Sequence, residues 1–263
     1  MPTRIQNLLL VVVVALFGWP ASAAERQVHE VLPARADGTV SIEIVSGSVR
    51  FSGWDRNEVQ IEGTLQEDVE GLDIDSGDSH VSIEVDLVDS GGRLNRADAH
   101  LEIHVPSGSR FEAESVSADL TFESISGRVN VESVNGDVQI RGEVSEAEVS
   151  TVSSEITLET GAAFRDGDFQ TVSGSVDFRG ALAREARLNV ESVSGDVTLR
   201  LDRSTAADFR VETFSGDIDN QLGPEARQSS PYVPAKTLSF SVGSGGARVT
   251  IESFSGKIHL LPR

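Results

Sequence analysis

The sequence predicts an all-β protein, in the form of a β-solenoid of stacked coils of about 20 residues with an N-terminal β capping region. Three observations predict this fold class. A unit of the form Ser/Thr-apolar-Ser-Gly recurs, apolar and polar residues alternate on both sides of it, and no stretch after Ala24 holds the 3.6-residue period of a helix. An antiparallel β-sandwich is the alternative, because Ser-Gly corners also suit hairpins.

Residues 1–23 are expected to be a secretory signal peptide. Arg4 precedes an apolar run over residues 8–17, and Ala21-Ser22-Ala23 supplies the small-x-small pattern that a signal peptidase cleaves. The run has about ten residues, whereas a membrane-spanning helix needs roughly 20. We therefore expect an exported chain, periplasmic or secreted to the cell surface, that begins near Ala24 and has no transmembrane anchor after cleavage. An uncleaved N-terminal anchor is the alternative.

The composition limits the partners and the chemistry. The 263 residues include 22 Lys and Arg against 42 Asp and Glu, a net charge of −20. Nucleic acid is normally bound by basic patches, so we expect no nucleic-acid partner. The chain has no cysteine, which excludes disulfides, thiolate chemistry and an N-terminal lipid-modified cysteine.

Residues 24–105 are expected to form an N-terminal β region without regular spacing. A first coil with an uncovered strand edge invites aggregation, so we expect this region to cap the stack. Alternating apolar residues predict its strands at Thr39–Ile44, Ser48–Phe51, Glu58–Leu65, His80–Val88 and His100–Val105.

Residues 106–263 contain the repeat and are expected to form the solenoid. In residues 196–201 the apolar positions alternate, which is typical of a strand with one buried face. Glycine accepts turn conformations and serine hydrogen-bonds to nearby backbone, so each Ser-Gly pair predicts a tight corner between two strands. One unit is too small to bury a core alone, and stacking supplies it. The clear copies are Ser124–Gly127, Thr171–Gly174, Ser192–Gly195, Thr213–Gly216 and Ser253–Gly256.

Residues 220–236 interrupt the repeat. They are rich in Pro, Gly, Gln and Ser, and we expect an inserted loop on which a binding residue such as Tyr232 could lie. At the other end of this region, Pro262 is expected to block the final strand edge of the stack, because proline lacks the amide donor that a further strand would need.

Three segments carry a resemblance to a known family. The run Gly47-Ser-Val-Arg-Phe-Ser-Gly-Trp-Asp55 looks like an opening signature, Val105-Pro-Ser-Gly108 like the element before the repeats, and Gly245-Gly-Ala-Arg-Val249 like the C-terminal coil. They resemble the bacterial "putative adhesin" family of unknown function, over essentially all of residues 25–263. The resemblance implies a β-helical envelope or surface protein, similar to proteins associated with envelope-stress regulation, with no catalytic residues to carry over.

Acidic residues recur at equivalent positions before the corner (Glu132, Glu191, Glu212, Glu252) and after it (Asp137, Asp196, Asp217). In parallel stacked coils, equivalent residues lie about 4.8 Å apart, and like charges at that distance repel and attract counter-ions. We hypothesise weak Ca²⁺ binding by Glu191, Asp196, Glu212 and Asp217. The alternative is a solvated face whose charge keeps the protein soluble. No other cofactor is expected.

His100, Glu102 and His104 alternate along one predicted strand and share a face. All three together span roughly 13 Å, too far for one metal ion, which favours a solvated outer face. The large polar-edged aromatic residues Trp54 and Tyr232 are few for sugar subsites, and no nucleophile motif is present. The sequence therefore favours a non-enzymatic envelope protein, an adhesin or binding module that presents β faces to a glycan or an envelope protein. A carbohydrate-active enzyme and a periplasmic accessory of envelope-stress signalling are the alternatives.

Overall fold

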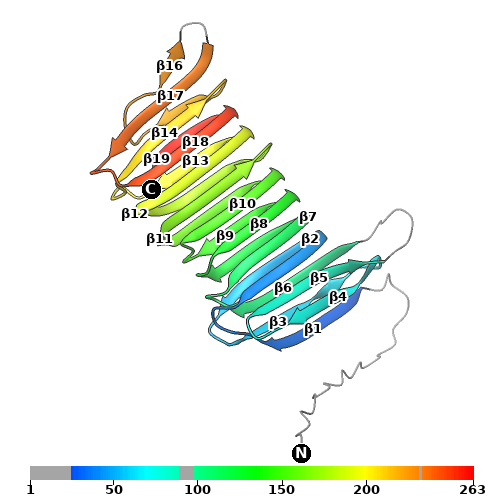
Figure 1. Ribbon diagram of the computed structural model, residues 1–263. Coiled ribbons are helices and arrows are strands. Elements are labelled where there is room, and N and C mark those ends of the chain that lie inside the picture. Colours follow the sequence, from blue (N-terminus) through cyan, green and yellow to red (C-terminus); the bar gives the residue numbers. More distant parts are fainter. Residues whose placement is uncertain (1–24, 89–96, 231–232) are drawn as a thin grey trace, which may run out of the picture.

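The computed structural model describes residues 25–88, 97–230 and 233–263, and Figure 1 shows their strands in one long stack. The expectation of an all-β protein is confirmed, because the described residues form strands and turns and no helix. Accordingly, nothing helical in this part of the chain is long and apolar enough to cross a membrane. The expected signal peptide, residues 1–23, lies outside the described residues.

Strands of the N-terminal part are β1 (Arg26–Pro33), β2 (Thr39–Trp54), β3 (Glu58–Leu65), β4 (Val69–Ser76), β5 (His80–Leu87) and β6 (Asp98–Pro106). The middle contains β7 (Arg110–Ile125), β8 (Val129–Asn135), β9 (Val138–Gly142), β10 (Glu146–Ser153), β11 (Ile156–Thr171), β12 (Val176–Ser194) and β13 (Val197–Leu201). The C-terminal part contains β14 (Ala207–Thr213), β15 (Asp217–Asn220), β16 (Arg227–Ser230), β17 (Val233–Val242), β18 (Ala247–Ser255) and β19 (Lys257–Pro262).

Repeat units stack on one another in parallel and in register. Each unit has a segment that enters the Ser-Gly corner and a segment that leaves it, and we call one such pair a coil. Val190, in an entering segment, pairs with Phe169 of the coil before it and with Ile251 on its other side. The leaving segments pair in the same parallel manner. Register is fixed in this way because a slip of one residue would turn the apolar side chains outward.

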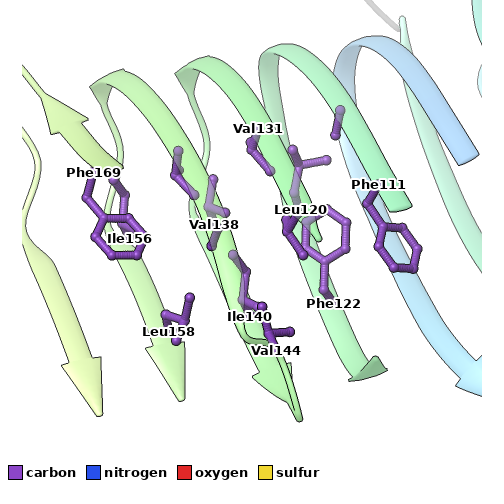
Figure 2. Close-up of a cluster of buried hydrophobic side chains, with 14 of the residues drawn as sticks. Phe111, Leu120, Phe122, Val131, Val138, Ile140, Val144, Ile156, Leu158 and Phe169 are labelled. Atoms are coloured by element: carbon purple, nitrogen blue, oxygen red, sulfur yellow. The ribbon is translucent and has the colours of Figure 1, made fainter. Parts of the chain in front are cut away.

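The core lies between the entering and leaving segments. In β13 the three residues Val197, Leu199 and Leu201 are buried and the residues between them are half-buried, which matches the alternation in the sequence. Figure 2 shows such inward side chains from successive coils in one continuous row. Phe51 and Phe122, from neighbouring coils, stack with ring centroids 4.9 Å apart.

At the N-terminal end, later strands cover the first coil. β2 already has the entering and leaving segments of a coil, and it pairs along its length with β7. On its other side β5 and β6 pair with it in parallel. Beyond them β4 pairs antiparallel with β5, and β3 pairs antiparallel with β6 and β1.

At the C-terminal end, the last coil in sequence is not the last coil in space. β18 and β19 lie between the coil of β12 and β13 and the coil of β14 and β15. The expectation that Pro262 blocks the final edge is therefore wrong, because β19 has partners on both sides. Figure 1 shows the C-terminus beside β19, inside the stack.

The stack ends instead with a hairpin of β16 and β17, whose second strand pairs antiparallel with β14. This hairpin occupies much of the region 220–236 that was expected to be a loop. Tyr232 lies outside the described residues.

Candidate functional site

A hydrogen bond shapes the Ser-Gly corner. In the coil of Thr171, the Gly174 amide donates to Thr171 Oγ1 at 2.9 Å, and the threonine side chain is buried. The hydroxyl replaces a backbone acceptor at the point where the chain changes direction. The same bond joins Ala118 to Ser115 at 2.9 Å and Gly216 to Thr213 at 3.0 Å.

The corner glycine is required by close approach between coils. A Cβ atom on Gly195 would lie 1.9 Å from the carbonyl oxygen of Gly174, and one on Gly256 would lie 2.2 Å from that of Gly195. At Gly195 and Gly256 any other residue would press its side chain into the backbone of the neighbouring coil, whereas the corner of Ser115 has Ala118 at the equivalent position.

The apolar residue of the corner points toward solvent with or without the hydroxyl–amide bond, since the hydroxyls of Ser192 and Ser253 have no partner within the described residues. Side chains alternate along a strand, so the residue after the buried serine or threonine points outward. Val172 is 45% exposed, Val193 is 51% exposed and Phe254 is 55% exposed. We call the full set the corner row, which in spatial order consists of Val45, Val116, Val134, Val152, Val172, Val193, Phe254 and Phe214.

The corner row ends in an exposed aromatic pair. Phe254 and Phe214 belong to neighbouring coils, and their rings stack with centroids 5.0 Å apart and planes at 11°. Both rings are about half exposed, at 55% and 47%. Each coil of the stack thus adds one exposed apolar group to a continuous line, and the two largest groups lie together.

A row of glutamates runs parallel to the corner row, two residues earlier in each coil. The register pairs Glu191 with Glu252 and Glu252 with Glu212, so the three stand side by side. Ser150 and Gln170 replace glutamate in the two central coils. The glutamate row, in spatial order, consists of Glu84, Glu43, Glu114, Glu132 and then, beyond the two neutral residues, Glu191, Glu252 and Glu212.

Two shallow grooves follow these rows. One, of 680 Å³, has Val172, Val193 and the phenylalanine pair along it together with Glu191, Glu252 and Glu212. The other, of 530 Å³, has Val45, Val116, Val134 and Val152 along it together with Glu43, Glu84, Glu114 and Glu132. Each groove therefore has apolar groups beside carboxylates.

Aspartates after the corner have a structural role. Asp196 Oδ1 accepts the backbone N–H of Lys257, one coil away, at 2.8 Å. Asp137 accepts the amide of Glu155 at 3.1 Å in the same way. Each such carboxylate tethers neighbouring coils at the corner, where the strand ladder is interrupted.

The four candidate Ca²⁺ ligands do not come together. Glu191 and Glu212 lie in the glutamate row with Glu252 between them, whereas Asp196 and Asp217 lie across the corner on either side of Lys257. The Lys236 ammonium also pairs with Asp217, and its hydrogen bond lowers the pKa of that carboxyl.

Among the described residues, no three His, Asp or Glu side chains are placed to hold one metal ion. Weak Ca²⁺ binding stays a prediction, which melting curves in millimolar Ca²⁺ and in chelator test directly. Equal melting temperatures would end it.

His100, Glu102 and His104 lie on the outer face of β6. His100 Nδ1 is 2.9 Å from Ser48 Oγ, and His104 Nε2 is 3.8 Å from Glu102 Oε1. The His104 ring stacks on Trp54 with centroids 5.0 Å apart. Trp54 is thus half-buried by a neighbour and does not stand free as a sugar platform.

The corner row is the feature that sequence reasoning missed, although its signal is in the repeat. The second position of Ser/Thr-apolar-Ser-Gly is always apolar, and its neighbours leave it no place inside. The repeat therefore places one exposed hydrophobic residue in each corner of the row.

The sequence matches the family described as Toastrack DUF4097 over residues 32–261. No curated protein matches the chain. A "putative adhesin" from Bacteroides fragilis has a crystal structure with a TM-score of 0.45 and 11% identity, covering 91% of this chain and 99% of that one.

Two further crystal structures are similar at the same low identity. A "putative cell adhesion protein" from Clostridium sporogenes has a TM-score of 0.39 and 11% identity, covering 91% of this chain and 100% of that one. A "Putative lipid binding protein" from Parabacteroides distasonis has a TM-score of 0.39 and 11% identity, covering 89% of this chain and 94% of that one.

Proposed function

The chain belongs to the Toastrack DUF4097 family, and we propose that it is an exported, non-enzymatic binding protein of the bacterial envelope that holds its partner along the corner row. Export rests on residues 1–23, which have the layout of a signal peptide. The binding role rests on the surface of the stack.

The single observation that carries the binding role is the alignment of eight exposed apolar side chains. Scattered exposed valines are ordinary on a protein surface, but a continuous line of them is typical of a contact surface. Phe254 and Phe214 provide the largest apolar area, and aromatic residues dominate the energy of many interfaces. A line that gains one group per coil suits a long partner.

The proposal of a non-enzymatic protein is supported by the shape of the grooves. The carboxylates stand in a line along each groove, one per coil, and the grooves are shallow. Catalysis by paired carboxylates needs two such groups that face one reacting bond.

We also propose that the repeating part of the chain is a β-solenoid that residues 24–105 cap at one end. In-register parallel pairing between successive coils supports it, as does the corner contact between Gly195 and Gly174. A solenoid explains the row directly, because identical positions of successive coils lie one above another.

The test combines a glycan array and a set of purified envelope proteins with turnover assays on each hit. We expect a hit that is bound and not turned over. The double variant Val172→Ser, Val193→Ser should weaken binding, whereas Val31→Ser, at a valine of similar exposure on β1, should not. Turnover of a bound glycan would contradict the non-enzymatic role. Binding that ignores the double variant would remove the corner row from the site.

A further inference from the structure

We propose that the corner grooves bind a basic amphipathic α-helix of a partner polypeptide. This inference rests on the proposed binding role of the corner row and adds the chemistry and the shape of the partner. Three observations carry it: the charge of the grooves, the spacing of the two rows and the position of the phenylalanine pair.

Charge complementarity determines the sign of the partner. Seven glutamates stand in the row, and the groove beside Val116 and Val134 has no basic residue among those that line it. The groove beside Val193 has one, Lys236, which pairs with Asp217. Arg210 already pairs with Glu212 at 2.8 Å. A ligand that covers the corner row therefore brings its neighbouring groups mainly against Glu191 and Glu252 in this groove and against the four glutamates of the other, and Lys or Arg side chains satisfy them.

Spacing favours a helix over an extended chain. Coils lie about 4.8 Å apart, and a helix rises about 5.4 Å per turn, so a helix along the stack presents one side chain per turn to each coil. An extended chain repeats a face only every ~6.8 Å and loses register within two coils. The corner row and the glutamate row are two residues apart in each coil, which is about 7 Å along a strand. A helix that follows both rows therefore needs an apolar stripe beside a basic stripe.

The difference between the rise per helical turn and the coil spacing limits the length of the contact. After four turns the helix has drifted by roughly 2.4 Å, about half of a coil spacing. The glutamate row is divided accordingly, because Ser150 and Gln170 separate a segment of four glutamates from a segment of three. Each segment lies in one groove, although Ser150 lines both grooves and Gln170 lines the groove of the three glutamates. We expect each groove to take a helix of about four turns, the length that the drift allows.

Phe254 and Phe214 anchor the helix in the groove of Glu191, Glu252 and Glu212. Their stacked rings form a flat apolar surface at one end of the corner row. Large apolar side chains of the partner pack there, while its Lys or Arg residues reach the carboxylates. A second copy of this chain would place glutamate against glutamate, and an anionic membrane would face the same repulsion.

Binding of designed peptides tests the inference. The probe is a fluorescent Leu and Lys peptide of about 16 residues with a helical apolar period, measured by anisotropy against the full exported chain. A peptide of identical composition with alternating Leu and Lys, and a helical peptide with Glu in place of Lys, are the controls. We expect the helical basic peptide to bind, the alternating peptide to bind about tenfold more weakly, and the acidic peptide not to bind.

Variants locate the contact on the chain. Glu191→Lys with Glu252→Lys, and separately Phe254→Ser, should each weaken binding by about tenfold or more. The matched controls Glu185→Lys and Val31→Ser, at exposed residues outside the rows, should leave it unchanged. Unchanged melting curves show that each variant is folded.

If the alternating peptide binds with the same affinity as the helical basic peptide, the partner need not be a helix, and only the groove remains as the site. A second outcome is that the peptide fails to bind while anionic vesicles, a glycan or a second copy binds and the row variants weaken that binding. In that case the proposed function stands and this inference is wrong. If no ligand responds to the row variants, both are wrong.

Discussion

Thr171 and Gly174 show how two residues determine the exposure of a third. The threonine hydroxyl accepts the glycine amide at 2.9 Å, and the glycine lies against the backbone of the neighbouring coil. Val172, between them, has no route to the core. The exposed apolar residue is thus a consequence of how the corner closes.

Gly195→Ala should destabilise the protein by about 1–3 kcal/mol, because the new methyl group overlaps the Gly174 carbonyl oxygen. The matched control is Gly71→Ala, where the nearest atom to a new Cβ is an Arg26 nitrogen at 4.0 Å. That change should lie within roughly 0.5 kcal/mol of the parent or stabilise it. Urea unfolding measures both. Equal effects would contradict the close approach.

Thr171→Val removes the hydroxyl and keeps the side-chain volume. It leaves the Gly174 amide and the buried Thr151 hydroxyl without their acceptor, so we expect a loss of about 1–3 kcal/mol in the free energy of unfolding. Ser192 occupies the equivalent position, and its buried hydroxyl has no partner within the described residues. Ser192→Ala should therefore be neutral or stabilising. A larger loss for Ser192→Ala than for Thr171→Val would refute this account of the corner.

For single residues, the sequence predicts well which side chains point into the core, because apolar and polar residues alternate along the strands. Val197 and Leu199 are buried as expected. Exposure of Val172 is not predicted, because valine normally counts toward the core and only the three-dimensional corner turns it outward. The same holds for Asp196, whose bond to the Lys257 amide needs the neighbouring coil.

Between elements, ion pairs relieve the repulsion of stacked acids. Glu146 on β10 lies between Arg128, next to β8, and Arg165 on β11, with Arg128 Nε at 2.8 Å and Arg165 Nη2 at 3.3 Å. The hydrogen bond from Arg128 lowers the pKa of Glu146 below its usual 4.5. One carboxylate therefore joins three adjacent strands.

Glu146→Gln tests this link through pH. A lowered folded-state pKa contributes stability that is complete above pH 4.5 and is lost as the pH falls through the lower folded value. The variant should lose under about 1 kcal/mol at neutral pH, and the difference from the parent should vanish in acid. Glu185→Gln, at an exposed glutamate, is the control for urea unfolding across pH. A difference that persists in acid would contradict the ion pairs.

Elements were predicted from sequence with uneven success. The expected strand Glu58–Leu65 coincides with β3, because alternation and flanking turn residues mark both ends. The β16–β17 hairpin was not predicted, because the composition of residues 220–236 is typical of a loop. The hairpin is held in place by the pairing of β17 with β14. This contact forms only in the folded chain, so the local sequence does not reveal it.

For the whole molecule, the order of coils in space is the decisive feature. β18 and β19 come last in sequence and have neighbours on both sides. Equivalent coils share one pattern, as Glu191, Glu252 and Glu212 show, so their order cannot be derived from pattern alone. Any two coils with this pattern can pair in register, so the pattern does not decide which coils are neighbours.

Native-state hydrogen exchange tests this order. Amides of Ile251 and Leu260 should exchange about as slowly as those of Val190 and Leu199, although chain ends usually fray. The edge strand β16 should exchange faster. Fast exchange at Ile251 and Leu260 would place the C-terminal coil at an open end of the stack.

The central claim is that the corner row is the binding surface, and the absence of cysteine makes it directly measurable. Single variants Val193→Cys and Val31→Cys carry an environment-sensitive fluorophore at unique positions. On addition of the helical basic peptide, the label at residue 193 should shift to the blue as it leaves water, and the label at residue 31 should not. A shift at residue 31, or none at residue 193 while the peptide is bound, would contradict the account.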